Sequence, residues 1–495
     1  RDYYASRGLG DVYKRQDIIC GFYLNLWKLV CSEFGILLDI YYLNITVNNI
    51  RKLMRKVACI FIFLTVTMML CSQTKIWTLE ECMEYAVRNN MRVSSQETRN
   101  RNYTQNYREA IAKLLPSVKV NVNTNLSFGR GLDSETNIYT DVNSFSNTYE
   151  ISSGLVLFDG LTGITRARMQ KVSILLGKQQ LQEIKDITAY ETMETFFNTV
   201  FCYEMVDLAG QQWQESIQNL QRTKRMEELG LKSSPDVAEL AAKEAADSYN
   251  LTRQKNLLKI SIIRLKEKMY FPIDEDLQIA GYDSLEAVAK TEDSPLDIYR
   301  HALLFLPTAQ AAEASLRIRQ LSYREAKGAL FPTLVAQGGI STGFARFMDG
   351  SEYIPFSEQF RNKRGYYVGF SLSFPIFDGL ARISNVKRGK RELIIARNEK
   401  EEAQRTLYSE IEQAVADMNG QADEFYQAVR QEEAMQVAHR LNIRKYEEGL
   451  INAIELHASA NRLMQARLAK LNARLKYNLK KRLVNYYKGE PFISE

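Results

Sequence analysis

The chain has 495 residues, of which 45% are hydrophobic and 25% are charged, a composition typical of a folded protein rather than a disordered one. Lys and Arg number 65 against 59 Asp and Glu, but nine basic and five acidic residues fall within the first 72 positions, so the remainder carries 56 against 54 and is nearly neutral. This excludes the basic stripe of a nucleic-acid binder, and we expect no nucleic-acid partner. The three His residues and the Cys residues form no close cluster, so we expect no metal site and no cofactor.

Met54 is a better candidate for the first residue of the natural protein than Arg1. Met54 is followed by a basic region, and we expect residues 1–53 to be a non-native or mis-translated upstream segment. The alternative is a genuine additional helix around residues 18–45. Everything before Met54 is therefore left out of the fold prediction.

Residues 54–72 have the anatomy of a secretory signal peptide. Arg55 and Lys56 supply the positive charge, residues 57–70 are mostly apolar and uncharged, and polar sequence follows. Fourteen residues are too few to cross about 30 Å of hydrocarbon as a helix, which argues against a membrane anchor. Lipid attachment at Cys71 is a second alternative, although the residues before it are not small. We predict cleavage near Ser72.

The body of the chain contains an internal repeat. A Tyr-Arg-Glu-Ala sequence at 107–110 recurs at 323–326, an offset of 216 residues, and a Phe-Asp-Gly sequence at 158–160 recurs at 377–379, an offset of 219. Leu115-Pro116 and Gly230-Leu231 also recur, as Phe331-Pro332 and Gly449-Leu450, in the same order. The sequence therefore predicts two structural copies, residues 73–270 and 301–488, with a connector at 271–300 and a tail at 489–495.

Each copy contains two stretches in which apolar and polar residues alternate. Val118, Val120 and Val122, for example, alternate with Lys119, Asn121 and Asn123. A period of two predicts a strand with one apolar and one polar face, here over residues 117–128, 148–158, 333–344 and 366–377. The strands are long enough to cross a membrane when tilted, the polar face is small and nearly uncharged, and aromatic residues stand at the strand ends. Strands of a soluble sheet are the alternative.

The remainder of each copy is predicted to be helical. No Pro occurs between 116 and 235 or between 375 and 491, and heptad-like, charge-rich sequence fills the long helices 161–229 and 380–448. Shorter helices are predicted before the strands, at 85–115 and 302–331, and after the glycines, at 233–269 and 451–487. The two shorter helices of a copy together match the long one in length. The fold class is thus a mixed α/β membrane protein with a long α-helical coiled-coil barrel.

The strand number requires oligomerisation if the sheet lies in a membrane. Four strands cannot close a barrel, and open strand edges are not tolerated in lipid because their backbone groups find no water there. Two chains would give eight strands and almost no lumen, whereas three chains would give a transmembrane β-barrel of twelve strands. We therefore expect a homotrimer.

The ordered motifs resemble those of the TolC family of Gram-negative outer-membrane efflux and secretion channels. Trp77-Thr78-Leu79-Glu80-Glu81 is similar to that family's N-terminal signature, and the Pro and Asp-Gly landmarks stand at its strand boundaries. The resemblance covers about residues 75–488. It implies a trimeric twelve-stranded barrel in the outer membrane and a helical tunnel in the periplasm. It also implies the partners of such a channel: a periplasmic adaptor (membrane fusion) protein, an inner-membrane transporter and outer-membrane lipid.

The resemblance also nominates site residues. The turns that would meet the adaptor contain Gly230, Leu231, Ser234 and Asp236 in copy one and Gly449, Leu450 and Glu455 in copy two. Glu455 resembles an acidic residue at the pore constriction, although Ala458 stands where some members have a second acid. The strand–helix turns are Phe158-Asp159-Gly160 and Phe377-Asp378-Gly379. Capping of a helix is the competing interpretation for Asp236, and a solvated helix-start carboxylate is that for Glu455.

The expected function is that of a passive outer-membrane exit duct in tripartite efflux or type I secretion. A soluble or periplasmic coiled-coil structural protein is the alternative. An enzyme is not expected, because the sequence contains no phosphate-binding loop, nucleophile elbow or carboxylate pair that could be nominated. The three His residues, at 301, 439 and 457, are interpreted as surface or packing residues. Basic residues after the Asp-Gly turns fit either a solvated helix face or contact with anionic headgroups.

Overall fold

The computed structural model describes residues 75–132, 137–141, 143–281, 287–348 and 352–493. The chain divides into two compact units, Arg1–Lys75 and Ile76–Glu495, and the helices and strands that the structure describes all belong to the second. The predicted upstream segment and signal peptide lie outside the described residues. Among the residues that are described, no helix combines the length and the hydropathy needed to span a bilayer.

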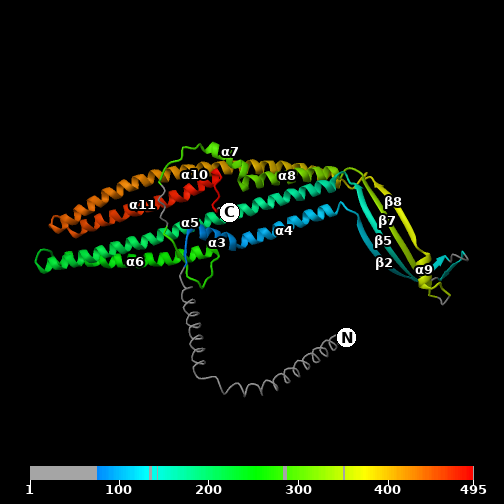
Figure 1. Cartoon of the computed structure of the whole chain (residues 1–495), viewed down its shortest axis with the longest axis horizontal. Helices are drawn as coiled ribbons and strands as arrows, with labels where there is room; N and C mark the ends of the chain where they lie inside the picture. Colours follow the sequence, from blue (N-terminus) through cyan, green and yellow to red (C-terminus); the bar gives the residue numbers. More distant parts are fainter. Residues whose placement is uncertain (1–74, 133–136, 142, 282–286, 349–351, 494–495) are drawn as a thin grey trace, which may run out of the picture. The chain divides into compact units, whose positions relative to one another are not determined.

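Four strands form one antiparallel sheet, which lies beyond one end of the helices in this unit (Figure 1). They are β2 (Ser117–Ser127), β5 (Ser144–Phe158), β7 (Thr333–Phe347) and β8 (Gly365–Ser373), in the order β2-β5-β7-β8. The central pair, β5 and β7, comes from the two different copies. A short hairpin, β3 (Arg130–Leu132) with β4 (Tyr139–Asp141), lies in the loop between β2 and β5. Within the chain, β2 and β8 are the edges of the sheet.

The strand register separates apolar from polar side chains. Directly paired residues point to the same face, so Val120 shares a face with Ile151 and Ile340, to which it is linked pair by pair across the sheet. The apolar face is highly exposed: Val118 is 70% and Val368 83% accessible in the single chain. The opposite face contains Lys119, Asn121, Ser152, Gln337 and Ser371. An apolar face left open to this extent is unusual for a soluble sheet.

The strand boundaries differ from the predicted ones at their outer ends. β5 begins at Ser144 rather than 148, and β7 continues to Phe347 rather than ending at 344. β8 ends at Ser373, so the prediction of strand to 377 is wrong there, because Pro375 has no N–H to donate to a ladder. A short helix that the sequence did not predict, α9 (Phe356–Asn362), precedes β8.

Two helical hairpins contain the longest elements. α5 (Thr162–Glu228) and α10 (Ala381–Glu447) each have 67 residues, and their returning partners α6 (Ser234–Met269) and α11 (Ala453–Lys488) each have 36. α5 packs along α6 in one hairpin and α10 along α11 in the other, while α8 contacts both long helices and so joins the two copies (Figure 1).

The helix that precedes each pair of strands is broken, which corrects the prediction of single helices at 85–115 and 302–331. α3 (Leu79–Asn89) and α4 (Met91–Ala112) meet at Asn90, whose backbone is extended and whose side chain accepts from the Arg92 N–H at 2.7 Å. α7 (Pro295–Phe305) and α8 (Pro307–Gly328) meet at Leu306, which precedes a Pro and is likewise extended. Both pairs have 11 and 22 residues.

The apolar core is concentrated where these breaks lie. One cluster unites α3, α5 and α6 around Met83, Met193 and Phe196, next to the parallel pair β1 (Ile76–Trp77) and β6 (Gln278–Ile279). A second cluster unites α7, α10 and α11 around Leu306, Ile411 and Tyr477. We call this region the belt. The only other apolar cluster among the described residues is small and lies near the hairpin turns.

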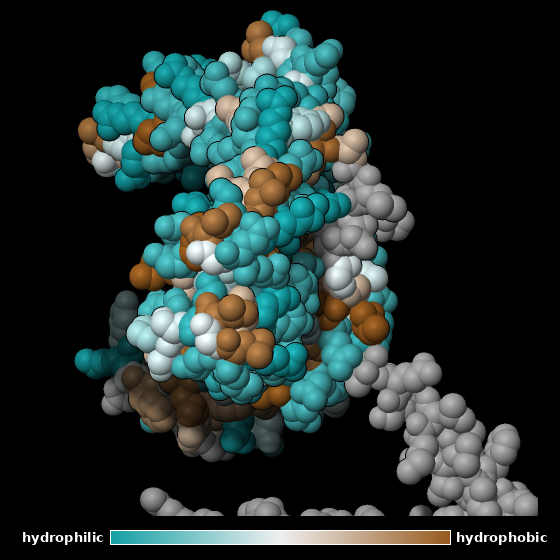
Figure 2. Space-filling model, turned by 90° about the vertical axis from the view of Figure 1, so that its left-hand side faces the viewer, coloured by the Kyte–Doolittle hydropathy of each residue, from teal (hydrophilic) through white to brown (hydrophobic). Residues whose placement is uncertain are grey.

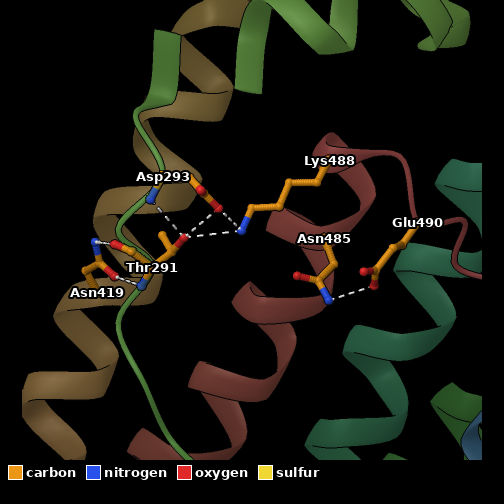
Figure 3. Close-up of polar contacts among 6 residues, drawn as sticks. All are labelled: Thr291, Asp293, Asn419, Asn485, Lys488 and Glu490. Carbon is orange, nitrogen blue, oxygen red and sulfur yellow. Dashed lines mark hydrogen bonds and ion pairs between the residues drawn. The ribbon is translucent and has the colours of Figure 1, made fainter. Parts of the chain in front are cut away.

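Side chains of α10 and α11 hold the connector between the copies against the belt (Figure 3). The Asn419 amide accepts from the Thr291 N–H at 3.0 Å and donates to the Thr291 carbonyl at 3.5 Å. Lys488 pairs with Asp293 at 2.5 Å and donates to the Thr291 hydroxyl, while Asn485 donates to Glu490. The neighbouring Lys488 ammonium lowers the pKa of the Asp293 carboxyl. The backbone N–H and carbonyl of Thr291 are thereby satisfied without a strand partner.

Candidate functional site

The turns from strand to long helix have the same backbone in both copies. Gly160 and Gly379 have φ of 68° and 67°, and the residues that follow them, Leu161 and Leu380, are also left-handed, with φ of 65° and 68°. The carboxylate of Asp159 accepts from the Gly163 N–H at 2.7 Å, and that of Asp378 accepts from the Arg382 N–H at 3.1 Å. Each Asp therefore caps the first turn of its long helix, which explains the Asp-Gly pair in physical terms.

The two turns differ in what surrounds their glycines. A Cβ on Gly160 would lie 2.0 Å from the carbonyl oxygen of Gly328, at the end of α8, whereas one on Gly379 would meet nothing within 4 Å. Phe377 is outside any strand and 80% exposed. The strand–helix turn at Gly160 is therefore held against α8 by close backbone packing, whereas the turn at Gly379 is open within this chain.

The predicted hairpin turns also share one geometry. Gly230 and Gly449 have φ of 74° and 77°, and the next residues, Leu231 and Leu450, donate their N–H groups at 2.8 Å to the carbonyls of Met226 and Lys445. These 6→1 bonds define a Schellman motif at the end of each long helix. The glycines are thus explained by helix termination.

The leucines of the two turns are not explained in that way. In a Schellman motif the residue after the glycine usually packs on its own helix, but Leu231 and Leu450 are 66% and 68% exposed. Ile454 nearby is also exposed. Figure 2 looks onto this end of the helices and shows separate hydrophobic patches on a mainly hydrophilic surface.

The two acidic residues of the turns have different surroundings. The carboxylate of Asp236 accepts from the Ser233 N–H at 3.2 Å and from the Ser233 hydroxyl at 2.7 Å, and the hydroxyl contact is the largest cause of its lowered pKa. Ser233 is therefore the N-cap of α6, and Ser234 is the first helical residue. Glu455 is exposed, and its N–H, not its carboxylate, is bound by the Asn452 cap at 2.9 Å. The Asp236 carboxylate thus takes part in a helix cap, whereas that of Glu455 accepts no capping hydrogen bond.

Contacts between the hairpins bring the two turns together, and none of these contacts was predicted. The Tyr446 hydroxyl lies 3.1 Å from that of Thr223 in a buried position, and the ammonium of Lys232 lies 4.0 Å from the centre of the Tyr446 ring. Arg222 pairs with Glu447. A small apolar cluster of Leu240, Tyr446, Ala453 and Leu456 fills the space between the hairpins. A lone aromatic residue three positions before a helix-ending glycine is the one sequence signal that could have suggested Tyr446.

Further from the turns, buried polar groups continue this contact. His439 of α10 is 5% exposed and lies 2.6 Å from Glu215 of α5 and 2.8 Å from the Ser459 hydroxyl of α11. His439 thereby links α10 to both α5 and α11. The interpretation of His439 as an ordinary residue therefore misses a link between the hairpins. Burial lowers the pKa of His457, one turn after the start of α11.

The polar groups near the turns are not arranged as ligands for a metal ion. Within the described residues, no group of three His, Cys, Asp or Glu side chains could hold a metal ion. A cavity of about 820 Å³ lies between α5, α6, α10 and α11 and is lined by residues such as Glu194, Arg264, Asp417 and Lys480. Its mixed charge and open form fit a wall between packed helices rather than a substrate pocket.

Comparison with known proteins relates the chain to outer-membrane channels. Residues 298–482 match the family model described as outer membrane efflux protein. This match spans somewhat more than a third of the chain and relates copy two to outer-membrane efflux proteins. The description of that model is one of a transport channel in the outer membrane. No curated protein matches the chain.

Solved structures of outer-membrane channels have the same fold as this chain. CusC superposes with a TM-score of 0.72 at 14% identity, covering 83% of this chain and 92% of its own. VceC of Vibrio cholerae gives 0.70 at 11% identity, with 84% and 96% covered, and MtrE of Neisseria gonorrhoeae gives 0.66 at 18%, with 83% and 88% covered. At these identities the likeness concerns the fold.

Proposed function

We propose that three copies of this chain form a passive exit duct through the outer membrane. In the duct, the four-stranded sheets of three protomers close into a twelve-stranded barrel, and their helical hairpins form a tunnel in the periplasm. The observation that supports this best is the sheet itself. Its two edge strands, β2 and β8, have free edges, one face is apolar and exposed, and the other is polar. Pairing β8 of one protomer with β2 of the next closes the two outer edges of the sheet and turns the apolar face toward lipid.

The two structural copies within a protomer fit this assembly. Each copy supplies two strands, one 67-residue helix and one 36-residue return helix, so a trimer would present six similar hairpins around one axis. At 1.5 Å per residue each long helix extends about 100 Å, enough to reach far into the periplasm. The sequence contains no phosphate-binding loop with which to use a nucleotide, so the duct is proposed to be passive and to receive cargo from an inner-membrane transporter.

The hairpin turns are proposed to bind the periplasmic adaptor. Leu231 and Leu450 occupy the same position in both turns and are exposed where a helix-ending leucine is usually packed. An apolar side chain held on a rigid turn is a suitable anchor for a partner surface. Replacing both leucines by Asn should abolish binding of the adaptor in a pull-down from the periplasmic fraction of the source cell, whereas replacing the exposed Leu304 of α7 in the same way should not.

The decisive measurement is the native mass of protein extracted by detergent from isolated outer membranes. A trimer supports the duct. A monomer, or protein recovered only without detergent, would contradict the barrel and favour the alternative of a soluble coiled-coil structural protein. The adaptor experiment is separate, since a trimer whose adaptor binding is unaffected by the leucine changes would refute only the role of the turns.

A further inference from the structure

The unpredicted helix α9 occupies an unusual place on the sheet. Its aromatic residues contact the apolar face: the rings of Phe356 and Phe360 lie 6.1 and 5.5 Å from that of Tyr149, and Phe356 lies 5.6 Å from Phe344. Tyr149 pairs with Val122 in the register and therefore shares the valine face. In a barrel, this face is the one turned toward lipid.

α9 is fastened to the sheet by its buried glutamine. β8 begins at Gly365, opposite Ser341, so the part of β7 beyond Ser341 has no strand on that side. The Gln359 amide takes its place: it accepts from the Ala345 N–H at 3.1 Å and donates to the Ala345 carbonyl at 2.9 Å. Gln359 is only 4% exposed. The helix thus covers an edge that would otherwise be open in lipid.

The depth of α9 follows from the length of β7. Twelve residues separate Thr333, at the helix end of the strand, from Ala345. At about 3.4 Å per residue and a tilt near 45°, Ala345 stands roughly 29 Å above Thr333, close to the thickness of the hydrocarbon layer. α9 therefore lies at the outer boundary of the membrane. Tyr353, Ile354 and Phe356, all about half exposed, stand at the depth where aromatic residues anchor barrels.

Positive charge gathers around this apolar surface. Arg346 pairs with Phe145 in the register and so lies on the lipid face, with its guanidinium 5.7 Å from the Phe145 and Tyr353 rings. Arg361 and Arg364 follow at the end of α9 and are exposed. Segment 346–364 has four basic and three acidic residues, but three of the basic ones fall within 361–364. Within the described residues, none of the three arginines has an ion-pair partner.

An arginine on a lipid face at the outer boundary needs an anion, because burying it there unpaired is costly. The outer leaflet of a Gram-negative outer membrane supplies one, a glycolipid with several acyl chains and phosphate groups. We propose that α9 and Arg346, Arg361 and Arg364 form a binding site for this phosphorylated glycolipid. The exposed aromatic residues contact the acyl chains, and the guanidinium groups bind the phosphates bidentately. The inference rests on the proposed barrel, which alone gives the sheet a lipid side.

The test is native mass spectrometry of the detergent-extracted full chain, with purified lipid A added in its bisphosphorylated and its dephosphorylated form. The variant is R346Q/R361Q/R364Q. The control is R253Q/K255Q/K259Q, which removes the same charge from exposed residues of α6, away from the sheet. With about a fivefold effect for each basic residue, the first variant should bind the bisphosphorylated lipid roughly 100-fold more weakly. The control should bind it like the unchanged chain.

The outcomes separate the two proposals. The dephosphorylated lipid should bind all three proteins equally, and inorganic phosphate at millimolar concentration should not displace the bisphosphorylated form. Trimers in which the arginine variant binds as tightly as the control would overturn the glycolipid site and leave the duct intact. Displacement by inorganic phosphate would show that the site takes free anions, which also overturns it. A monomer would instead contradict the proposed barrel.

Discussion

The two strand–helix turns form a natural experiment on backbone packing. Gly160 and Gly379 have the same left-handed φ to within a degree, so a Gly→Ala change imposes the same conformational strain on both. Their surroundings differ, because only at Gly160 would the new methyl group meet backbone atoms, those of Gly328. The difference between the two variants therefore isolates the cost of the clash.

The magnitudes can be worked out from the structure. An alanine in the left-handed region costs about 1–2 kcal/mol, and forced overpacking adds about 1–3 kcal/mol. Gly379→Ala should thus lose about 1.5 kcal/mol per protomer and Gly160→Ala about 3–4 kcal/mol. The compact unit from Ile76 to Glu495 has 420 residues, and at about 2.1 cal/mol/K per residue its unfolding entropy is roughly 0.9 kcal/mol/K. The expected decreases in Tm are about 2 °C and 4 °C.

A third variant tests the clash without the strain. Gly328 ends α8 in an ordinary helical conformation, where alanine is normally about 1 kcal/mol better than glycine. A Cβ there would lie 2.5 Å from the Gly160 carbonyl oxygen, so Gly328→Ala should lower Tm instead of raising it. The assay is thermal unfolding of detergent-solubilised protein at one scan rate, with all variants compared side by side. Equal shifts for Gly160→Ala and Gly379→Ala, or a stabilised Gly328→Ala, would refute the packing argument.

Four further predictions concern the hairpins and the sheet edge. Tyr446→Phe leaves the buried Thr223 hydroxyl unpaired and should destabilise the contact between the hairpins by about 1–3 kcal/mol. Amide hydrogen exchange near Gly230 and Gly449 should become faster. Adding Thr223→Val should restore most of the protection, and no recovery would argue against the pair. Gln359→Leu removes the hydrogen-bond partners of the Ala345 N–H and carbonyl. Thermal unfolding should show a loss of trimer stability of about 2 kcal/mol or more. Glu358→Leu, on the exposed side of α9, should cost little. Burial holds the folded-state pKa of His457 below 6.5, while Lys243, Glu239 and Asp247 face the ring. The unfolded chain therefore binds the extra proton first, and the free energy of unfolding should fall as the pH drops below about 6.5. In urea titrations from pH 7.5 to 5, His457→Gln should flatten this decline. Glu455→Gln should lower the cation preference of single channels in a planar bilayer if three such carboxylates ring the tunnel end, and an unchanged reversal potential would exclude that role.

The sequence allowed most elements of the fold to be predicted, because their signals are local. Alternation marks the strands, the absence of Pro marks the long helices, and glycines mark the turns. The break at Asn90 was missed because asparagine is tolerated within helices, and its cap on the Arg92 N–H becomes visible only in three dimensions. α9 was missed because seven residues are too few to show a helical period.

The candidate site could be predicted only where it depends on local geometry. Gly230 and Gly449 were identifiable because a left-handed helix end favours glycine. The partners of Tyr446 were not, since Thr223 is 223 positions away and the register between two helices is not encoded in either one. The contacts of His439 with Glu215 and of Gln359 with Ala345 were also not predictable, because in each case the partner of the polar side chain belongs to another secondary-structure element.

The uneven distribution of apolar packing has a mechanical consequence. In the belt each hairpin packs in a large apolar cluster, and the cluster around Met193 also includes Leu475 of the other hairpin. Near the turns the hairpins are joined only by a small apolar cluster, single hydrogen bonds and an ion pair among the described residues. Each return helix has 36 residues and is therefore about 54 Å long. If the belt acts as a pivot, a rotation of only about 5° displaces the turn by roughly 5 Å, about the width of a side chain. A few weak bonds at the end of such a lever are enough to hold it, and breaking them costs little.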